Sequence, residues 1–356
     1  MDTKDRLQKL IISAALTIAE ALEVMDRAGY GFLLVCDGDG RLEGILTDGD
    51  IRAAALRGEP FSQACRGIAC DSLVTALAPV TAGQALHLMD HSRGHGINQL
   101  PVVDATGRVV DLVLRSDLVE QERMPVSAVI MAGGAGVRLR PLTNSLPKVM
   151  LLVGDRPLLE IIIEQMRAAG IRDICVTTHY HGEKISDYFG SGENFGVQIR
   201  YVNEDAPMGT AGGLSLLPAQ GEPLLVINGD ILTRVDYRAM LAYHRRHVAA
   251  MTVGVRTYNL KVPYGVLDCD GLDVCGLREK PVVSFFVNAG VYLLNPEVHR
   301  MIPAGVRFDM TDLINALLQQ SRRVVSFPIV EYWQDIGQMC DYEQVQRDVL
   351  DGRVKP

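Results

Sequence analysis

The first third of the chain contains an internal repeat, and this repeat limits what the region can fold into. Residues 16–26 (LTIAEALEVMD) recur as residues 80–90 (VTAGQALHLMD), and residues 35–41 recur as 102–108. Each copy predicts a helix, a strand, a tight turn, a second strand and a second helix, because helical spacing gives way to short apolar runs around a turn. One such unit cannot bury its own apolar face, so we expect the two units to pack together.

A different pattern begins after a charged stretch at 120–125. Apolar strands are predicted at 126–131, 173–178 and 224–227, with a helix at 158–168 between the first two. Strands that alternate with helices indicate an α/β domain with a mostly parallel, buried sheet. We therefore expect two domains, 1–122 (with units at about 8–60 and 70–122) and 126–356, which suits a length of 356 residues.

Composition narrows the kinds of partner. The net charge of −8 argues against nucleic acid or an anionic membrane, and the 48% hydrophobic content is ordinary for a globular protein. No apolar run is long enough to span a bilayer. The seven cysteines form no CxxC pair, which favours reduced thiols and a cytoplasmic location. The eight histidines show no metal-ligand spacing, and His244 and His247 are expected on an exposed helix face.

The strongest functional signal is the string AVIMAGGAGVRLRPLT at 128–143, followed by LPKVM at 146–150. An apolar strand that enters a glycine turn lets backbone N–H groups approach a triphosphate closely. The string is neither a Rossmann fingerprint nor a Walker loop, because it lacks G-x-G-x-x-G and Gly-Lys-Ser/Thr. We expect Arg138 and Lys148 to neutralise phosphates, and the nucleotide to contact Ala132, Gly133, Gly134 and Gly136. The alternative is a tight packing turn with solvated cations.

These motifs resemble the signature of sugar-1-phosphate nucleotidylyltransferases, a family that includes glucose-1-phosphate thymidylyltransferase and mannose-1-phosphate guanylyltransferase. The resemblance covers about 126–348 and implies a Rossmann-like, GT-A-like α/β fold. Val137 stands where Ser or Thr is usual in the family, and Val149 where Pro is usual. Neither change removes a charge, so altered loop contacts are expected rather than lost activity.

The resemblance also implies a metal site. Asp230 follows the apolar strand 226–229, and Asp335 lies in the segment WQDIG at 333–337. In the family the two matching carboxylates hold Mg²⁺, an ion that takes one or two protein carboxylates and keeps several waters. Each Asp alone could equally be a turn or cap residue.

Two further segments match the family's substrate contacts. Residues 204–213 resemble the loop that contacts base and ribose, which implicates Pro207, Gly209 and Thr210; a plain connector before a helix at 213–217 is the alternative. The sugar phosphate is expected to contact Gly265, Glu279, Lys280 and Asn288, although a charged run such as 278–280 is usually a solvated face. Asp312 is expected to cap a helix at 313–320.

The repeat at the start of the chain resembles a pair of cystathionine-β-synthase (CBS) motifs, an α+β regulatory module that commonly binds adenosine nucleotides. Thr47 and Asp50 match the residues that hold a ribose, and Asp117 matches in the second unit, where Leu114 replaces the Thr. Alternatively, these Asp residues only cap helices.

Together the resemblances imply transfer of a nucleoside monophosphate from an NTP, with GTP favoured, to a sugar 1-phosphate. Glucosamine 1-phosphate and mannose 1-phosphate are the favoured acceptors, and the NDP-sugar would serve cell-surface glycan or nonulosonic acid synthesis. We expect Mg²⁺ as cofactor, a regulatory nucleotide and a homo-oligomer. The alternatives are UTP, dTTP or CTP with glucose 1-phosphate, or an inactive nucleotide-sugar sensor.

Overall fold

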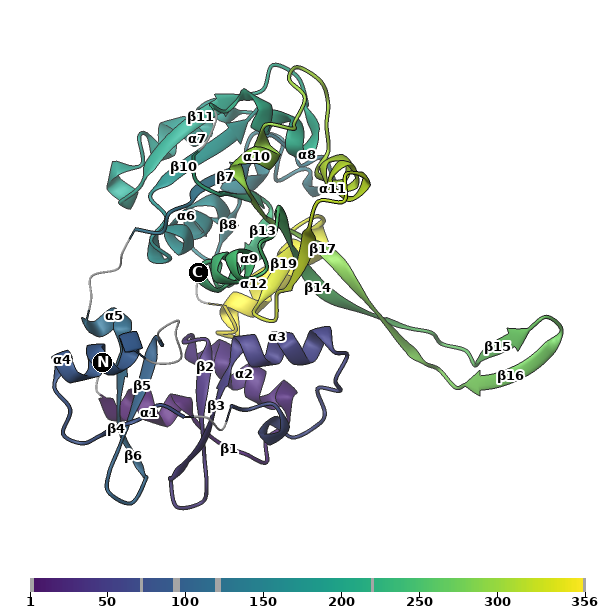
Figure 1. Cartoon of the computed structure of the whole chain (residues 1–356). Coiled ribbons are helices and arrows are strands. Elements are labelled where there is room, and N and C mark those ends of the chain that lie inside the picture. The colour runs from purple at the N-terminus through teal and green to yellow at the C-terminus, as the bar shows by residue number, and fades with distance from the viewer. Residues whose placement is uncertain (1–2, 71–72, 92–96, 119–122, 219–220, 355–356) are drawn as a thin grey trace.

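The computed structural model describes residues 3–70, 73–91, 97–118, 123–218 and 221–354, which form two bodies and a long arm (Figure 1). The stretch 119–122, which contains part of the predicted boundary, lies outside the described residues. Within the described residues, no helix is both long and apolar enough to cross a membrane.

The N-terminal body contains the two predicted units. Each has a three-stranded sheet, in the orders β1-β2-β3 and β4-β5-β6. The units meet where Leu42 donates its N–H to the carbonyl of Gly107 and Val109 donates to Gly40, and Leu112 and Leu114 of the second unit enter the first unit's core. The predicted packing of one unit on the other is therefore confirmed. The elements are α1 (Thr3–Leu10), β1 (Ile11–Ser13), α2 (Ile18–Ala28), β2 (Phe32–Cys36), β3 (Leu42–Thr47), α3 (Asp48–Leu56), β4 (Ala76–Leu77), α4 (Ala82–His91), β5 (Gln99–Val103), β6 (Val109–Leu114) and α5 (Arg115–Leu118).

The C-terminal body is built on a seven-stranded sheet in the order β11-β10-β7-β12-β17-β14-β18. The first four strands run parallel, β17 is antiparallel to both of its neighbours, and β18 is parallel to β14. The predicted mostly parallel α/β sheet is thus confirmed. The strands are β7 (Ser127–Met131), β10 (Asp173–Thr178), β11 (Gln198–Asn203), β12 (Leu224–Asn228), β14 (Met251–Lys261), β17 (Val282–Leu294) and β18 (Val324–Pro328).

Helices cover both faces of this sheet because its strands are apolar on both sides. Along β7, Ala128 and Ile130 point into one core and Val129 points into the other, as the two-residue period of a strand requires. The first core is covered by α6 (Leu158–Ala168), α7 (Gly182–Phe189), α9 (Tyr237–Arg246) and α12 (Met339–Leu350). The second is covered by α8 (Gly209–Gly212), α10 (Pro296–His299) and α11 (Met310–Gln319).

Three local predictions need correction. The helix predicted at 313–320 is α11, which begins at Met310 because Asp309 is its N-cap and Asp312 completes the capping box. The helix predicted at 213–217 is two short turns, α8 and a 3₁₀ segment (Gly213–Leu216). His244 is buried on α9, where Thr252 and Asn295 hydrogen-bond its two ring nitrogens, so it is not on an exposed face.

Three two-stranded pieces complete the domain. β13 (Ile231–Thr233) pairs with β19 (Trp333–Asp335), and β8 (Leu152–Val153) pairs with β9 (Arg156–Pro157). The third pair, β15 (Val266–Asp270) and β16 (Asp273–Arg278), lies at the tip of a long ribbon formed by the outer parts of β14 and β17, and the ribbon projects from the sheet (Figure 1). We call residues 257–286 the arm.

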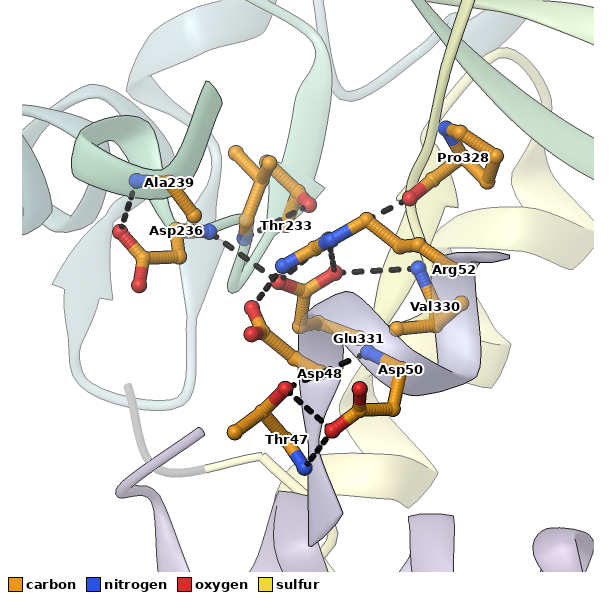
Figure 2. A network of polar contacts seen from close by, with 11 residues as sticks. Thr47, Asp48, Asp50, Arg52, Thr233, Asp236, Ala239, Pro328, Val330 and Glu331 are labelled. Atoms are coloured by element: carbon orange, nitrogen blue, oxygen red, sulfur yellow. Dashed lines mark hydrogen bonds and ion pairs between the residues drawn. The ribbon is translucent and has the colours of Figure 1, made fainter. Parts of the chain in front are cut away.

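A polar network joins the two bodies (Figure 2). Arg52 on α3 is 3% exposed, forms an ion pair with Asp48 and a second one with Glu331 at 3.0 Å, and donates to the carbonyl of Pro328. Its guanidinium also lies over the Phe327 ring. Val330, which lies two residues after Pro328, packs into the core of the N-terminal body. The segment before β19 is therefore held by the other domain.

Candidate active site

The glycine loop and Asp230 lie side by side because their strands are neighbours. β7 leads into the loop and the parallel strand β12 leads into Asp230, with Asn228 opposite Met131. Gly229 donates its N–H to the carbonyl of Met131 at 2.9 Å, and a Cβ at Gly229 would lie 2.7 Å from that oxygen. Only glycine permits this approach, so the sequence Asn-Gly-Asp places a carboxylate at the carboxyl edge of the sheet, where ligands bind in open α/β folds.

The second predicted carboxylate lies next to the first. Ile231 pairs with Asp335 in the β13–β19 ladder, and Ile336 donates its N–H to the carbonyl of Asp230. Asp335 remains accessible at the rim of the site, but partial burial of its carboxyl group and then the charge of Asp230 raise its pKa. Two carboxylates that repel each other are a donor set that a divalent cation relieves.

The chemistry of this pair fits Mg²⁺. Within the described part of the chain, no group of three or more His, Cys, Asp or Glu side chains could hold a metal ion. A cation at Asp230 and Asp335 would therefore complete its shell with water and phosphate oxygens, which is the coordination that Mg²⁺ favours over a cage made only of protein ligands.

Lys148 points at the same place. Its side chain is 10% exposed, and its Nζ donates to Oδ2 of Asp230 at 2.6 Å. The chain reaches this position through a compact turn, in which the Thr143 hydroxyl donates to the carbonyl of Gly136 at 2.8 Å. Gly136 has φ of +59°, and a Cβ there would lie 3.1 Å from that of Lys148. Glycine at 136 thus lets the loop fold tightly against Lys148.

Arg138 also lies near the acidic pair. It lies in a 3₁₀ turn (Val137–Leu139), and its positive charge counteracts the raised pKa of Asp335. Val137, one of the departures from the family pattern, is exposed, whereas Val149 is buried with its Cγ1 against Gly229. Both departures therefore lie in the loop and leave Arg138 and Lys148 in place.

The predicted nucleoside segment packs against the start of α11. Thr210 donates its N–H to Asp309 at 2.8 Å, and its hydroxyl accepts the N–H of Met310 at 2.8 Å, so this Thr helps to cap α11. Gly209 has φ of +81° and faces the same Asp309. Pro207 lies in the irregular segment before α8. The structure thus gives Thr210 and Gly209 a structural role, and their contact with a nucleoside stays a prediction.

The four predicted sugar-phosphate residues do not lie together. Asn288 is on β17 in the body, where it hydrogen-bonds the buried Tyr292, and Asp230 is close enough to influence the pKa of that tyrosine. Gly265 and Glu279 contact each other on the arm, where a Cβ at Gly265 would lie 3.0 Å from Oε2 of Glu279. Lys280 follows on the arm and is exposed.

The sequence analysis missed two polar residues of this site. Glu204 is 7% exposed; its carboxylate accepts the Met208 N–H and lies close to Gly133 and Gly213, so it joins the glycine loop to the nucleoside segment. Asn228 has a buried Oδ1 for which the described residues provide no hydrogen-bond partner. The signal for both was their position at a strand end, because Asn228 is the last residue of β12 and Glu204 directly follows β11.

In the N-terminal body, Thr47 and Asp50 contact each other. Thr47 is the N-cap of α3, and Oδ2 of Asp50 accepts both the backbone N–H and the hydroxyl of Thr47. The capping alternative is therefore realised at Asp50, which leaves ribose binding there as a prediction. Asp117 pairs with Arg6 of α1 at 2.6 Å.

Comparisons with known proteins agree with this architecture. The model of the nucleotidyl transferase family matches residues 127–352, and the CBS domain model matches 8–57 and 66–123. The chain is 32% identical to a UTP–glucose-1-phosphate uridylyltransferase from Synechocystis over 65% of this chain and 65% of that one. It is 34% identical to a mannose-1-phosphate guanyltransferase from Candida albicans over 61% and 62%.

A solved structure shows the fold. HddC from Yersinia pseudotuberculosis aligns with a TM-score of 0.50 at 23% identity, over 63% of this chain and 99% of that one. The chain spans less than two thirds of the length of the two curated relatives named above. The matched region nevertheless contains the whole seven-stranded sheet with both acidic residues at its carboxyl edge. The chain therefore belongs to the nucleotidyl transferase family and carries a pair of CBS domains ahead of that region.

Proposed function

We propose that this protein is a sugar-1-phosphate nucleotidylyltransferase, with a catalytic domain at 126–356 and a regulatory CBS pair at 1–122. The observation that carries the proposal is the ion pair between Lys148 and Asp230 beside Asp335, at the end of the glycine loop. Cations and carboxylates in this arrangement suit a triphosphate and a divalent ion.

The proposed reaction needs no general base. A sugar phosphate is already an anion near neutral pH, so one of its oxygens can attack the α-phosphorus in line while the bond to the β-phosphate oxygen breaks and pyrophosphate leaves. The chain's contribution is to hold the reacting groups and to neutralise charge. Arg138 and the loop N–H groups would hold the β- and γ-phosphates, and Lys148 would turn from Asp230 to the α-phosphate.

Mg²⁺, when bound by Asp230 and Asp335, would supply further neutralisation of the triphosphate charge. In its absence Lys148 compensates Asp230, whereas Asp335 keeps a raised pKa. The acidic pair is therefore arranged to receive a cation.

For substrates we propose GTP with glucosamine 1-phosphate or mannose 1-phosphate. The guanyltransferase from Candida albicans supports the choice of guanine, whereas the uridylyltransferase from Synechocystis keeps UTP with glucose 1-phosphate as the second candidate. A reaction that consumes an NTP suits the cytoplasm, and the product would enter glycan or nonulosonic acid synthesis.

The test is a pyrophosphate-release screen over NTP and sugar 1-phosphate pairs, with product mass as readout. One pair should turn over in the presence of Mg²⁺, and Asp230→Ala should reduce kcat by about 10²–10³-fold or more, because one electrostatic contact is commonly worth that much. Asp187→Ala, which removes an exposed carboxylate on α7, is the control and should keep the wild-type rate. Tight nucleotide binding without turnover of any pair would favour an inactive sensor.

For the CBS pair we propose that a nucleotide binds at Thr47 and Asp50 and regulates the catalytic domain. The observation in favour is that α3 begins at these residues and also carries Arg52, which holds the segment leading to β19. Titration with adenosine nucleotides, followed by calorimetry and by activity, tests this. Binding that Thr47→Ala does not weaken would contradict the assignment.

A further inference from the structure

The arm has one apolar face that its own chain leaves open to solvent. In the ladder, Tyr258 is paired with Phe285 and Leu260 with Val283, and paired residues point to the same side of a ribbon. The opposite side is mixed: Asn259 and Ser284 hydrogen-bond each other there, between the pairs that contain Phe286 and Val282. An antiparallel ribbon of this pattern normally packs its apolar face against something. A two-stranded ribbon alone is at best marginally stable.

The exposed apolar surface is large enough for a stable interface. The arm's large apolar side chains are 46–101% exposed, and they are Tyr258, Leu260, Tyr264, Leu267, Leu272, Val274, Leu277, Val282, Phe285 and Phe286. Summed over both faces of the ribbon and its tip, they present on the order of 1,000 Å², and a standard interface buries about 800 Å² on each partner. A patch of that size marks an interaction surface rather than an ordinary exposed face.

The arm also carries residues that the catalytic site lacks. Glu279 and Lys280 are two of the four proposed sugar-phosphate contacts, and Asn288 is in the body beside Tyr292. The ladder runs without a register shift from the pair Val255–Asn288 to the pair Lys261–Val282. Six residues of strand separate Val282 from Asn288, so Lys280 lies roughly 20 Å or more from Asn288. That distance exceeds the reach of a lysine side chain across a sugar phosphate.

We propose that a second copy of this chain covers the arm. In this two-fold assembly, each arm lies on the carboxyl edge of the other copy's sheet and delivers Glu279 and Lys280 to the sugar phosphate there. A second copy is the partner that supplies both an apolar surface and an active site missing these two groups, and exchange of identical elements is a common route to such dimers. The inference rests on the proposed function, because it assigns the sugar-phosphate contacts to two chains.

The decisive experiment combines two inactive variants in one mixed dimer. Asp230→Asn disables the body and Lys280→Ala disables the arm, so each variant alone should be nearly inactive. The two are co-expressed with different tags, and the mixed dimer is isolated through both. If arms act across the interface, one of its sites carries both defects and the other carries neither, so the mixed dimer should recover about half of the wild-type turnover. Activity no higher than that of either variant alone would overturn the proposal.

A second measurement tests the interface without activity. By light scattering, the full chain should have twice the 38.9 kDa mass of one copy, and Phe285→Asp on the apolar face should return it to one. Ser284→Asp on the opposite, mixed face is the matched control and should stay dimeric. A monomeric wild type, or a Phe285→Asp variant that stays dimeric, would refute the interface. If the wild type turns over no substrate, the proposed function fails, and these masses still decide whether the arm joins two copies.

Discussion

At the scale of single residues, the acidic pair Asp230 and Asp335 at the edge of the sheet lowers the stability of the folded protein near neutral pH. Partial burial and the charge of Asp230 raise the pKa of Asp335, so the ionised form of Asp335 is less favourable in the folded protein than in the unfolded chain. This cost is absent at low pH, where the group is protonated in both states, and is complete above the raised pKa.

Asp335→Asn should therefore raise Tm at about pH 7 in the absence of Mg²⁺, and the gain should vanish near the ordinary carboxylate pKa of about 4. The same change should reduce Mg²⁺-dependent turnover by about 10²–10³-fold, because it removes a charged contact to the ion. Thermal denaturation at the two pH values and initial rates measure both effects. Asp187→Asn serves as the control. A Tm that falls at neutral pH would show that the repulsion is not the dominant influence on Asp335.

Residue types and spacing pointed to charged groups that the structure brings together, because Asp230, Lys148 and Arg138 belong to motifs that follow strands. They were not sufficient to predict which side chains hydrogen-bond each other. The helical position of His244 could not reveal that Thr252 and Asn295 bind its ring, since those partners lie on other elements. For the same reason Asp309 was missed as the cap that also holds Thr210.

At the scale of elements, α3 connects the two domains. Its first turn is built on Thr47 and Asp50, and one turn later Arg52 reaches Glu331 (Figure 2). Glu331 in turn accepts the N–H groups of Asp236, the N-cap of α9, and of Val330. A change at the start of α3 would thus reach β19 through one buried ion pair.

Arg52→Gln should lower the free energy of unfolding by about 3 kcal/mol, because it leaves the partly buried carboxylates of Glu331 and Asp48 without their partner. Arg57→Gln on the same helix removes an exposed pair with Glu59 and should cost less than about 1 kcal/mol. Denaturant titration of both variants gives the comparison. Equal losses would mean that the buried network contributes no more than a surface pair.

The strands β7, β10 and β12 of the sheet were predictable from the sequence, and the arm was not. β7, β10 and β12 are continuous apolar runs between helices, so their burial follows from composition alone. The arm's strands also contain Tyr, Phe, Leu and Val, but these side chains are exposed. Apolar residues predict that a surface is covered; they do not say by which chain.

At the scale of the whole molecule, each domain has its own hydrophobic core, and polar contacts such as the Arg52–Glu331 ion pair join the two domains. The two cores on either face of the large sheet consist of residues after 123, whereas Val330 belongs to the core of the N-terminal body. A further hydrogen bond between the two domains runs from the Arg234 guanidinium to the carbonyl of Asp26 at 2.9 Å.

Deletion of residues 1–122 should leave a folded, active catalytic domain with a lower Tm, because Val330 becomes exposed and Glu331 loses Arg52. In that shortened protein Glu331→Gln should change Tm little, since the carboxylate is exposed there and keeps the N–H groups of Asp236 and Val330. In the full chain the same substitution should lower Tm, since it breaks the pair with Arg52. Melting curves of the four proteins test this difference. An insoluble deletion variant would instead show that the domains fold only together.

The position of β19 in the chain also has a consequence for biosynthesis. Asp230 and the glycine loop leave the ribosome well before Asp335, which arrives on the last strand of the domain. A nascent chain can thus contain most strands of the sheet before Asp335, the second residue of the acidic pair, has been synthesised. A nascent chain that has not yet reached β19 therefore lacks the second carboxylate of the proposed metal site.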